Sequence, residues 1–385
     1  MFQRQRFLEA IQSQFNIHEV CALIGPRQCG KTTLAQEYAK QNAGVVTFFD
    51  LENPEALMAL QNPLRILENL TGLVVIDEIQ RLPDLFPVLR VLADRKQARY
   101  LILGSASRDL IRQSSESLAG RIGYIELTPF QIAEGGDESK LLTRGGFPDS
   151  YLAVSDRDSY NWRKSYIRTY LERDIPALGF NVPPLTLQRF WMMLAHYHGQ
   201  LLNMNQIGTA MGISGHTVRH YLEILTGTFM VRLLPPWFEN TEKRQTKSPK
   251  LYIRDSGLFM NLVRIEDADQ LVTSPLRGAI WEGFALEQII AALEMEMNEV
   301  FFWRTINGAE IDLMIFKGNK RYGFEFKFGD APSTTRSMRI ALNDLRLEHL
   351  YVIYPGQQNI ILDDQITAVP LSQMLKDQNL FPATK

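Results

Sequence analysis

Residues 25–32 read Gly-Pro-Arg-Gln-Cys-Gly-Lys-Thr, directly after the apolar run at 20–24 and directly before a helical pattern. A glycine-rich loop between a strand and a helix lets successive backbone N–H groups turn toward phosphates. The lysine of such a loop reaches the terminal phosphates, and the hydroxyl of the next residue is placed to hold Mg²⁺. The stretch therefore predicts a nucleoside triphosphate site. The residues expected to contact ATP are Gly25, Pro26, Arg27, Gln28, Cys29, Gly30, Lys31, Thr32 and Thr33.

An acidic pair follows the next buried strand of β-branched character. Residues 73–76 read Leu-Val-Val-Ile and lead into Asp77 and Glu78. Acidic side chains at the carboxyl end of a buried parallel strand lie where open α/β sheets bind ligands. We expect Asp77 to hold Mg²⁺ together with Thr32, and Glu78 to act as the general base that polarises the attacking water.

Two further polar positions suit the same reaction. Ser105 or Ser107, after the apolar run at 100–103, is placed to sense the γ-phosphate, although a capped turn is an equally good interpretation. Arg121, in Leu-Ala-Gly-Arg before another strand, is a candidate arginine finger supplied in trans, because transition-state charge needs a permanent planar cation. An ordinary surface arginine is the alternative. A finger in trans implies a homo-oligomer.

These motifs also carry a resemblance. The loop and its continuation, Ile-Asp-Glu-Ile-Gln-Arg-Leu-Pro at 76–83, Leu-Gly-Ser-Ala-Ser at 103–107 and Gly-Gly-Phe-Pro at 145–148 resemble a prokaryotic family of AAA+ type P-loop ATPases. In that family the ATPase domain is fused to a C-terminal domain of unknown function 4143, with a nuclease-like fold. The likeness runs through essentially the whole chain. Cys29 departs from the family pattern, which more often has an aliphatic residue there.

The pattern of apolar runs predicts an α/β protein of more than one domain. Alternating strands and helices to about residue 127 indicate a doubly wound parallel sheet, opened by a helix with Phe7, Leu8, Ile11 and Phe15 on its buried face. We expect a P-loop ATPase domain over 1–150, a helical segment and winged helix-turn-helix over 151–260, and an α/β restriction-endonuclease-like domain over 261–385.

The middle region contains a helix-turn-helix pattern. Residues 206–211 and 216–225 read as two helices around a turn at 212–214, with Ser214 as N-cap of the second. Strand-like runs at 230–234 and 250–253 flank a basic loop that suits the wing of a winged helix. Expected DNA contacts are His216, Thr217, Arg219, Lys243, Arg244 and Lys247. Winged helices also dock proteins, so a protein partner is the alternative.

The final third holds an Asp and, 13 residues later, a Glu-x-Lys on an alternating strand. Alternation puts Glu325 and Lys327 on one face of the strand. Asp312 and Glu325 would share a Mg²⁺ that activates water, Lys327 would stabilise charge on phosphate, and Glu282 would add a carboxylate. Spacing alone is weak evidence, and carboxylates that serve only structure are the alternative.

Composition limits the class of protein. The chain has 385 residues, 45% apolar and 22% charged, with two cysteines and a net charge of −2. Residues 155–254 contain thirteen Lys and Arg against seven Asp and Glu, so contact with a polyanion is expected there. No apolar stretch approaches the roughly 20 residues of a membrane helix, and we expect a cytoplasmic protein without disulfides.

The sequence thus predicts an ATPase that uses ATP and Mg²⁺ and binds or remodels DNA, with branched or broken DNA as one target class. The alternatives are a nucleotide-dependent protein-interaction switch without DNA chemistry and an active ATP-dependent DNA nuclease.

Overall fold

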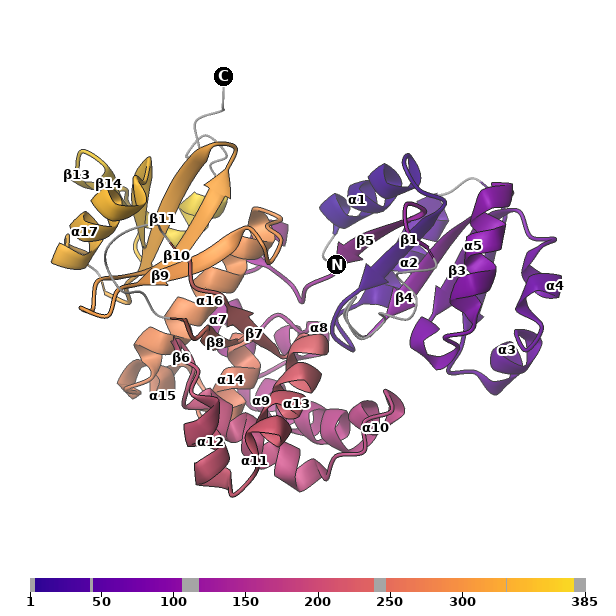
Figure 1. Cartoon of the computed structure of the whole chain (residues 1–385), viewed down its shortest axis with the longest axis horizontal. Helices are drawn as coiled ribbons and strands as arrows, with labels where there is room; N and C mark the ends of the chain where they lie inside the picture. The colour runs from indigo at the N-terminus through magenta and orange to yellow at the C-terminus, as the bar shows by residue number, and fades with distance from the viewer. Residues whose placement is uncertain (1–3, 42–43, 106–117, 239–246, 330, 377–385) are drawn as a thin grey trace. The chain divides into compact units, whose positions relative to one another are not determined.

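A computed structural model describes residues 4–41, 44–105, 118–238, 247–329 and 331–376 of the chain (Figure 1). The chain divides into two compact units. The first contains Met1–Pro129, Arg173–Asn181 and Glu223–Met230, and the second contains the remaining segments. In the described residues no helix is long and apolar enough to cross a membrane.

The first unit is built on a parallel sheet of five strands in the order β2-β3-β4-β1-β5. Its strands are β1 Val20–Ile24, β2 Val46–Asp50, β3 Gly72–Asp77, β4 Ala98–Gly104 and β5 Ile122–Glu126. All neighbouring pairs in this order are parallel. Every residue of β1 is buried, as expected for a central strand covered on both faces. The predicted doubly wound parallel sheet is confirmed.

Helices cover both faces of this sheet. On one face, α1 (Gln5–Phe15) and α2 (Lys31–Gln41) pack on Cys21, Leu23 and Val75. Phe7, Leu8, Ile11 and Phe15 are the buried side of α1, as predicted. On the other face, side chains of α4 (Pro63–Leu67) and α5 (Leu85–Arg95) pack on the alternate strand positions. The short helices α3 (Pro54–Ala59) and η1 (Ile79–Arg81) complete the unit.

Two short segments from later in the chain complete the first unit's core. Phe229 is a buried member of the α4/α5 cluster, and Leu178 packs against it. The segment with Leu178 follows a π-helical turn, η3 (Tyr170–Asp174), and contains α10 (Ile175–Ala177). The structure therefore divides the chain differently from the expected boundary at residue 150, because the first continuous segment of the first unit ends at Pro129, and the helices at 138–144 and 148–151 belong to the second.

The second unit begins with a helical layer around a small sheet. The elements from residue 130 to residue 262, of which the end of α13 from Glu223 onward belongs to the first unit, are η2 Ile132–Glu134, α7 Glu138–Arg144, α8 Pro148–Tyr151, α9 Asp156–Thr169, α11 Pro184–Ala195, β6 Gln200–Leu201, α12 Met204–Met211, α13 Gly215–Gly227, β7 Val231–Leu234, β8 Lys250–Ile253 and α14 Ser256–Leu262. The three strands form an antiparallel sheet in the order β6-β8-β7. The predicted helix pair is α12 and α13, and Gly212 between them has the left-handed φ of 65° that suits glycine.

A mixed sheet of six strands follows, in the order β13-β14-β12-β11-β10-β9. The elements are α15 Ala268–Thr273, α16 Arg277–Ala292, β9 Val300–Arg304, β10 Glu310–Lys317, β11 Lys320–Phe326, α17 Arg336–Leu345, β12 His349–Tyr354, β13 Ile360–Asp363, β14 Ile366–Pro370 and α18 Leu371–Lys376. β10 and β11 form an antiparallel hairpin, while β11, β12 and β14 run parallel. The expected α/β character of this part is confirmed.

Candidate functional site

The phosphate-loop stretch lies between β1 and α2, as the sequence predicts. Its backbone is tightly constrained: a Cβ atom at Gly25 would collide with the carbonyl oxygen of Leu127. Gly30 has a φ of 97°, a conformation that L side chains rarely adopt, and it directly precedes the first turn of α2. Both loop glycines are therefore required by the backbone, which leaves the helix N-terminus open to an anion.

Lys31 donates hydrogen bonds within the loop, and Thr32 donates one to β3. The Nζ of Lys31 donates to the carbonyl oxygens of Gly25 and Pro26, at 3.0 and 2.9 Å. The Oγ1 of Thr32 donates to Asp77 Oδ2 at 2.6 Å. Hydroxyl and carboxylate oxygens are the ligands that Mg²⁺ prefers. The two predicted ligands thus lie side by side, and the donor set fits a magnesium ion.

Glu78 and Ser105 are brought together at the ends of neighbouring strands β3 and β4. Ser105 Oγ donates to Glu78 Oε1 at 3.2 Å, and Gln80 Nε2 donates to the other carboxylate oxygen. Glu78 has a left-handed φ of 55°, which is uncommon for a residue with a side chain and marks a constrained position. The predicted base is therefore held by two polar neighbours. Ser107 lies outside the described residues.

Arg121 and Arg27 are both engaged within the first unit. Arg121 donates two hydrogen bonds to Asp94, at 2.6 and 3.1 Å. To act as an arginine finger in a neighbouring subunit, Arg121 would first have to leave Asp94. Arg27, in the phosphate loop, donates to Asp174 Oδ1 at 2.8 Å and to Glu52 at 2.5 Å. Burial raises the pKa of Asp174 to about 6, against the opposing effect of Arg27.

The remaining loop residues differ in exposure. Cys29 is fully buried with its Sγ 3.5 Å from the Leu127 carbonyl oxygen, and burial raises the pKa of the thiol. Gln28 and Thr33 are exposed. Cys29 thus faces the core, while the two polar residues face solvent.

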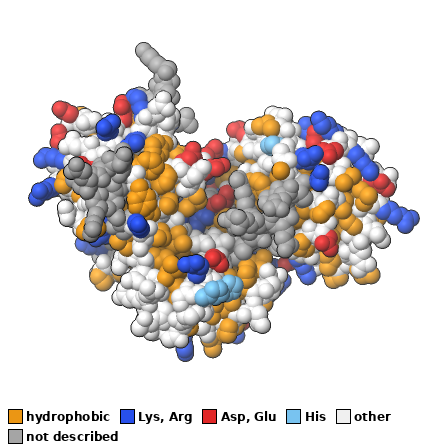
Figure 2. Space-filling view, viewed as in Figure 1, with side chains coloured by type: hydrophobic (Ala, Val, Ile, Leu, Met, Phe, Trp, Pro, Cys, Tyr) orange, Lys and Arg blue, Asp and Glu red, His pale blue; other side chains and the backbone are white. Residues whose placement is uncertain are grey.

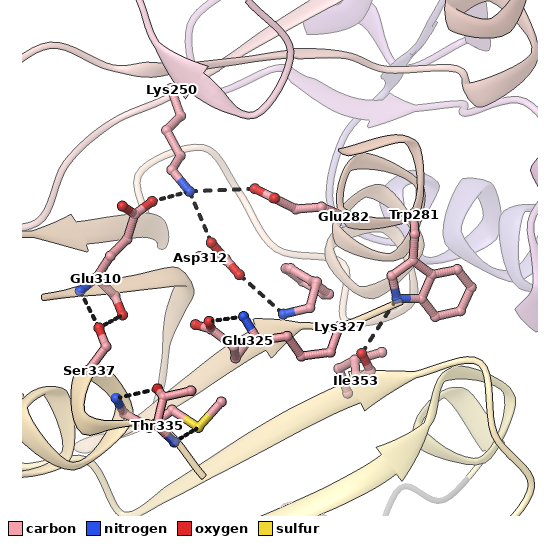
Figure 3. Close-up of polar contacts among 12 residues, drawn as sticks. Lys250, Trp281, Glu282, Glu310, Asp312, Glu325, Lys327, Thr335, Ser337 and Ile353 are labelled. Atoms are coloured by element: carbon pink, nitrogen blue, oxygen red, sulfur yellow. Dashed lines mark hydrogen bonds and ion pairs between the residues drawn. The ribbon is translucent and has the colours of Figure 1, made fainter. Parts of the chain in front are cut away.

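The second unit gathers the predicted carboxylates, with a lysine among them (Figure 3). Lys250 Nζ lies 3.0 Å from Asp312 Oδ1, 3.4 Å from Glu282 Oε1 and 2.5 Å from Glu310 Oε1. Lys327 Nζ binds Glu325 Oε1 at 2.7 Å. The structure therefore brings Glu282 and Asp312 onto one ammonium group and pairs Glu325 with Lys327.

Burial dominates the electrostatics of this cluster. It raises the pKa of Glu282 to about 7 and that of Glu325 to about 8, with Asp312 as the next cause in each case. Burial alone would lower the pKa of Lys250, but Tyr252 and the surrounding carboxylates raise it well above the usual range. Lys250 is therefore charged. The magnesium site expected at Asp312 and Glu325 stays a prediction.

The expected DNA contacts lie on α13 and beyond β7. His216 and Arg219 are exposed on α13, and Ser214 Oγ accepts from the backbone N–H of Thr217 as the predicted N-cap. The side chain of Thr217 also bonds to that of Ser214. Lys247 is exposed just before β8, whereas Lys243 and Arg244 lie outside the described residues.

Sequence reasoning missed Asp174, Lys250 and Glu310. Asp174 is 147 residues from Arg27, and Lys250 is 62 residues from Asp312. No spacing rule connects residues so far apart in the chain. The only local signal is a lysine at the first position of the otherwise apolar strand β8, which would have to find partners if that strand is buried.

Known protein families match successive segments along most of the chain. Three family models cover successive segments: an AAA domain over residues 18–135, a domain of unknown function (DUF8612) over 136–269 and a domain of unknown function (DUF4143) over 277–374. The uncharacterized proteins Rv2008c of Mycobacterium tuberculosis and Mb2031c of Mycobacterium bovis are each 48% identical over 360 residues, which are 92% of this chain and 81% of theirs.

A search of solved structures found the Walker-type ATPase of Pyrococcus abyssi, at 14% identity and a TM-score of 0.48. The match covers 68% of this chain and 96% of that one.

Proposed function

Because the chain belongs to the prokaryotic family of AAA-type P-loop ATPases with a C-terminal domain of unknown function 4143, we propose that it hydrolyses ATP and couples turnover to binding or remodelling DNA. The observation that carries the ATPase part is the convergence of Lys31, Thr32 with Asp77, and Glu78 with Ser105 at one edge of a parallel sheet. These are the residue types that phosphoryl transfer to water requires, in the order that a P-loop sheet presents them.

Each residue has a defined task in this proposal. Phosphate oxygens of ATP would replace the carbonyl oxygens of Gly25 and Pro26 as partners of the Lys31 ammonium. Thr32 and Asp77 would hold Mg²⁺, which neutralises phosphate charge when bound. Glu78 would orient the attacking water, and Ser105 would set the position of the Glu78 carboxylate. Arg121 from a neighbouring subunit would stabilise the transition state after leaving Asp94.

The DNA part of the proposal is supported by the arrangement around α13. The order α11, β6, α12, α13, β7, β8, with β8 central in its sheet, is compatible with a winged helix, in which α13 would take the place of the recognition helix. His216 and Arg219 are exposed on its N-terminal half, which is the part that meets base edges in such folds. The basic loop before β8 would contact phosphates.

The alternative of a nucleotide-dependent protein switch has its own support. Arg219 is the one Lys or Arg of α13, and the exposed Glu223 follows one turn later. On the face in Figure 2, Lys and Arg side chains are dispersed among other types. A surface of this mixed character also suits protein docking.

The first test is steady-state ATPase activity with no DNA, single strands, linear duplex and a four-way junction, with Lys31→Ala as the blank. Strong stimulation by one form supports coupling to DNA and identifies the substrate class. Equal rates with all forms would overturn the DNA proposal in favour of the protein switch.

The DNA face predicts a change in salt dependence. Neutralising Arg219, Lys243, Arg244 and Lys247 to Gln should make the slope of log affinity against log salt shallower by roughly one unit for each phosphate interaction that is removed. Fluorescence anisotropy with a labelled duplex measures the slope. A control variant neutralises four exposed basic residues elsewhere and should keep it: Lys317, Arg336, Arg339 and Arg346. Equal slopes in the two variants would refute this face.

The Arg27–Asp174 pair predicts a pH dependence. In the folded protein the pKa of Asp174 is about 6, above the ordinary value of 3.8. Asp174 therefore becomes neutral as pH falls through about 6, and Arg27 then loses one of its anionic partners. The contribution of Asp174 to the free energy of unfolding changes in the opposite direction from its charge. This contribution is largest below about pH 4 and is lost as pH rises toward 6, because the folded state binds the proton more tightly than the unfolded state does. We expect KM for ATP to rise as pH falls from 7 to 5.5.

Asp174→Asn should flatten this change in KM, while Asp149→Asn, an exposed acid, should not. Initial-rate kinetics across this pH range, in buffers of constant ionic strength, provide the measurement. An unchanged pH profile in Asp174→Asn would assign the titration to another group.

A further inference from the structure

The carboxylate cluster of the second unit is organised around a cation that the chain itself supplies. Three acidic side chains, Glu282 from α16 and Glu310 and Asp312 from β10, lie within 3.4 Å of Lys250 Nζ. Figure 3 shows the three carboxylates directed at that one nitrogen, two from β10 and one from α16. An ammonium group has three N–H donors and no acceptor, so three carboxylate oxygens use all of its bonding capacity.

The acids are also satisfied without a further ion. Asp312 uses its second oxygen to accept from the backbone N–H of Phe326 at 3.1 Å. Glu282 Oε1 accepts from the hydroxyl of Tyr252 at 2.7 Å. Arg304 binds the second oxygen of Glu310 at 3.2 Å. Each of these three acids therefore has a partner in addition to Lys250, whereas Oε2 of the neighbouring Glu325 is buried without a hydrogen-bond partner among the described residues.

Lys250 is buried, so its side chain is not a mobile surface lysine. The Lys250 side chain is 3% exposed, and it begins β8, the central strand of the small sheet. A buried ammonium without acidic partners would be strongly unfavourable, as would carboxylates without a cation. In the described part of the chain, no group of three or more His, Cys, Asp or Glu side chains has the arrangement of a metal site.

We infer that the ammonium of Lys250 holds the place a divalent cation would take among Glu282, Glu310 and Asp312, so this cluster is an internal cation site that needs no metal. A second positive ion close to Nζ would meet direct repulsion in a poorly solvated setting. The cluster therefore ties the small sheet to α16 and β10 through charge, and it does not activate water by way of a metal. This inference is independent of the ATPase proposal.

The experiment is a Mn²⁺ titration of the full chain without nucleotide, read by the electron paramagnetic resonance signal of free Mn²⁺ and by thermal melting. Every sample carries Asp77→Asn, which removes a ligand of the proposed nucleotide-site metal. We expect no Mn²⁺ binding that depends on Asp312 in this parent. Lys250→Ser should create space and leave the acids unpaired, so it should bind about one Mn²⁺ per chain and melt higher with Mn²⁺ present.

Two matched variants make the result decisive. Adding Asp312→Asn to Lys250→Ser should remove the new Mn²⁺ site, and Lys250→Arg, which keeps a cation, should bind none. If Lys250→Ser does not fold, the parent and the arginine variant decide the question. Mn²⁺ binding by the parent that Asp312→Asn abolishes would overturn the inference, as would a folded Lys250→Ser that binds no Mn²⁺.

Discussion

Glu78→Gln is expected to lower ATP turnover on the order of a hundredfold or more and to leave ATP binding in place. The amide keeps the size of the side chain, and its oxygen can still accept from Gln80 while its NH2 group donates to Ser105 Oγ, but it does not polarise water as a carboxylate does. In the proposed site, binding would depend on Lys31 and the loop backbone, which the substitution does not change. Steady-state turnover and equilibrium binding of a fluorescent ATP analogue measure the two effects separately.

Lys31→Ala and Glu55→Gln provide the controls. Lys31→Ala should lose both binding and turnover, because it removes the cation that is proposed to contact the terminal phosphates. Glu55 is an exposed acid on α3, and Glu55→Gln should retain both. Loss of ATP binding in Glu78→Gln would count against its assignment as the base.

Glu287→Ala should destabilise the second unit by about 3–5 kcal/mol. The Glu287 carboxylate is buried and accepts from Arg232, with one contact at 2.8 Å, and from Arg254 at 3.2 Å. Burial would raise its pKa, but the two guanidinium groups lower it, so Glu287 is ionised. Truncation leaves two cations in a poorly solvated interior without their anion, which explains the size of the expected effect.

Urea unfolding followed by tryptophan fluorescence measures this destabilisation. Glu348→Ala is the matched control, since Glu348 binds Lys320 at 2.6 Å on the surface, where removal of an ion pair has little effect on stability. Similar midpoints for the two variants would show that burial does not set the strength of the Glu287 contacts.

Because Arg232 lies on β7 and Glu287 on α16, we also expect Glu287→Ala to weaken any effect of DNA on ATP turnover before it affects basal ATP turnover.

The arrangement of the residues proposed for ATP hydrolysis was largely predictable because these residues follow a local rule. Each of Lys31, Asp77 and Ser105 comes at or directly after the end of a parallel strand or its loop, and parallel strands present these ends at one edge. The helix-turn-helix was predictable for a similar reason, since Gly212 and Ser214 mark a turn and a cap within a few residues.

Contacts between distant residues were not predictable in this way. The sequence offers no signal that Asp174 meets Arg27, or that Lys250 meets Asp312, because such pairs arise from the packing of whole elements. The expected boundary at residue 150 also differs from the division into two compact units for this reason. Apolar residues in the segment that continues from α13 look like ordinary helix core, yet Phe229 packs beneath the ATPase sheet.

The participation of Phe229 and Leu178 in that core affects how this architecture can be inherited. A gene piece that ends at Pro129 would encode the P-loop and all five strands but omit two apolar side chains of the core and the acid that binds Arg27. Such a piece is therefore expected to be less stable on its own than the complete first unit. The two parts of the gene are expected to be exchanged between genomes only together, and a split protein should regain activity only when both fragments are supplied at once.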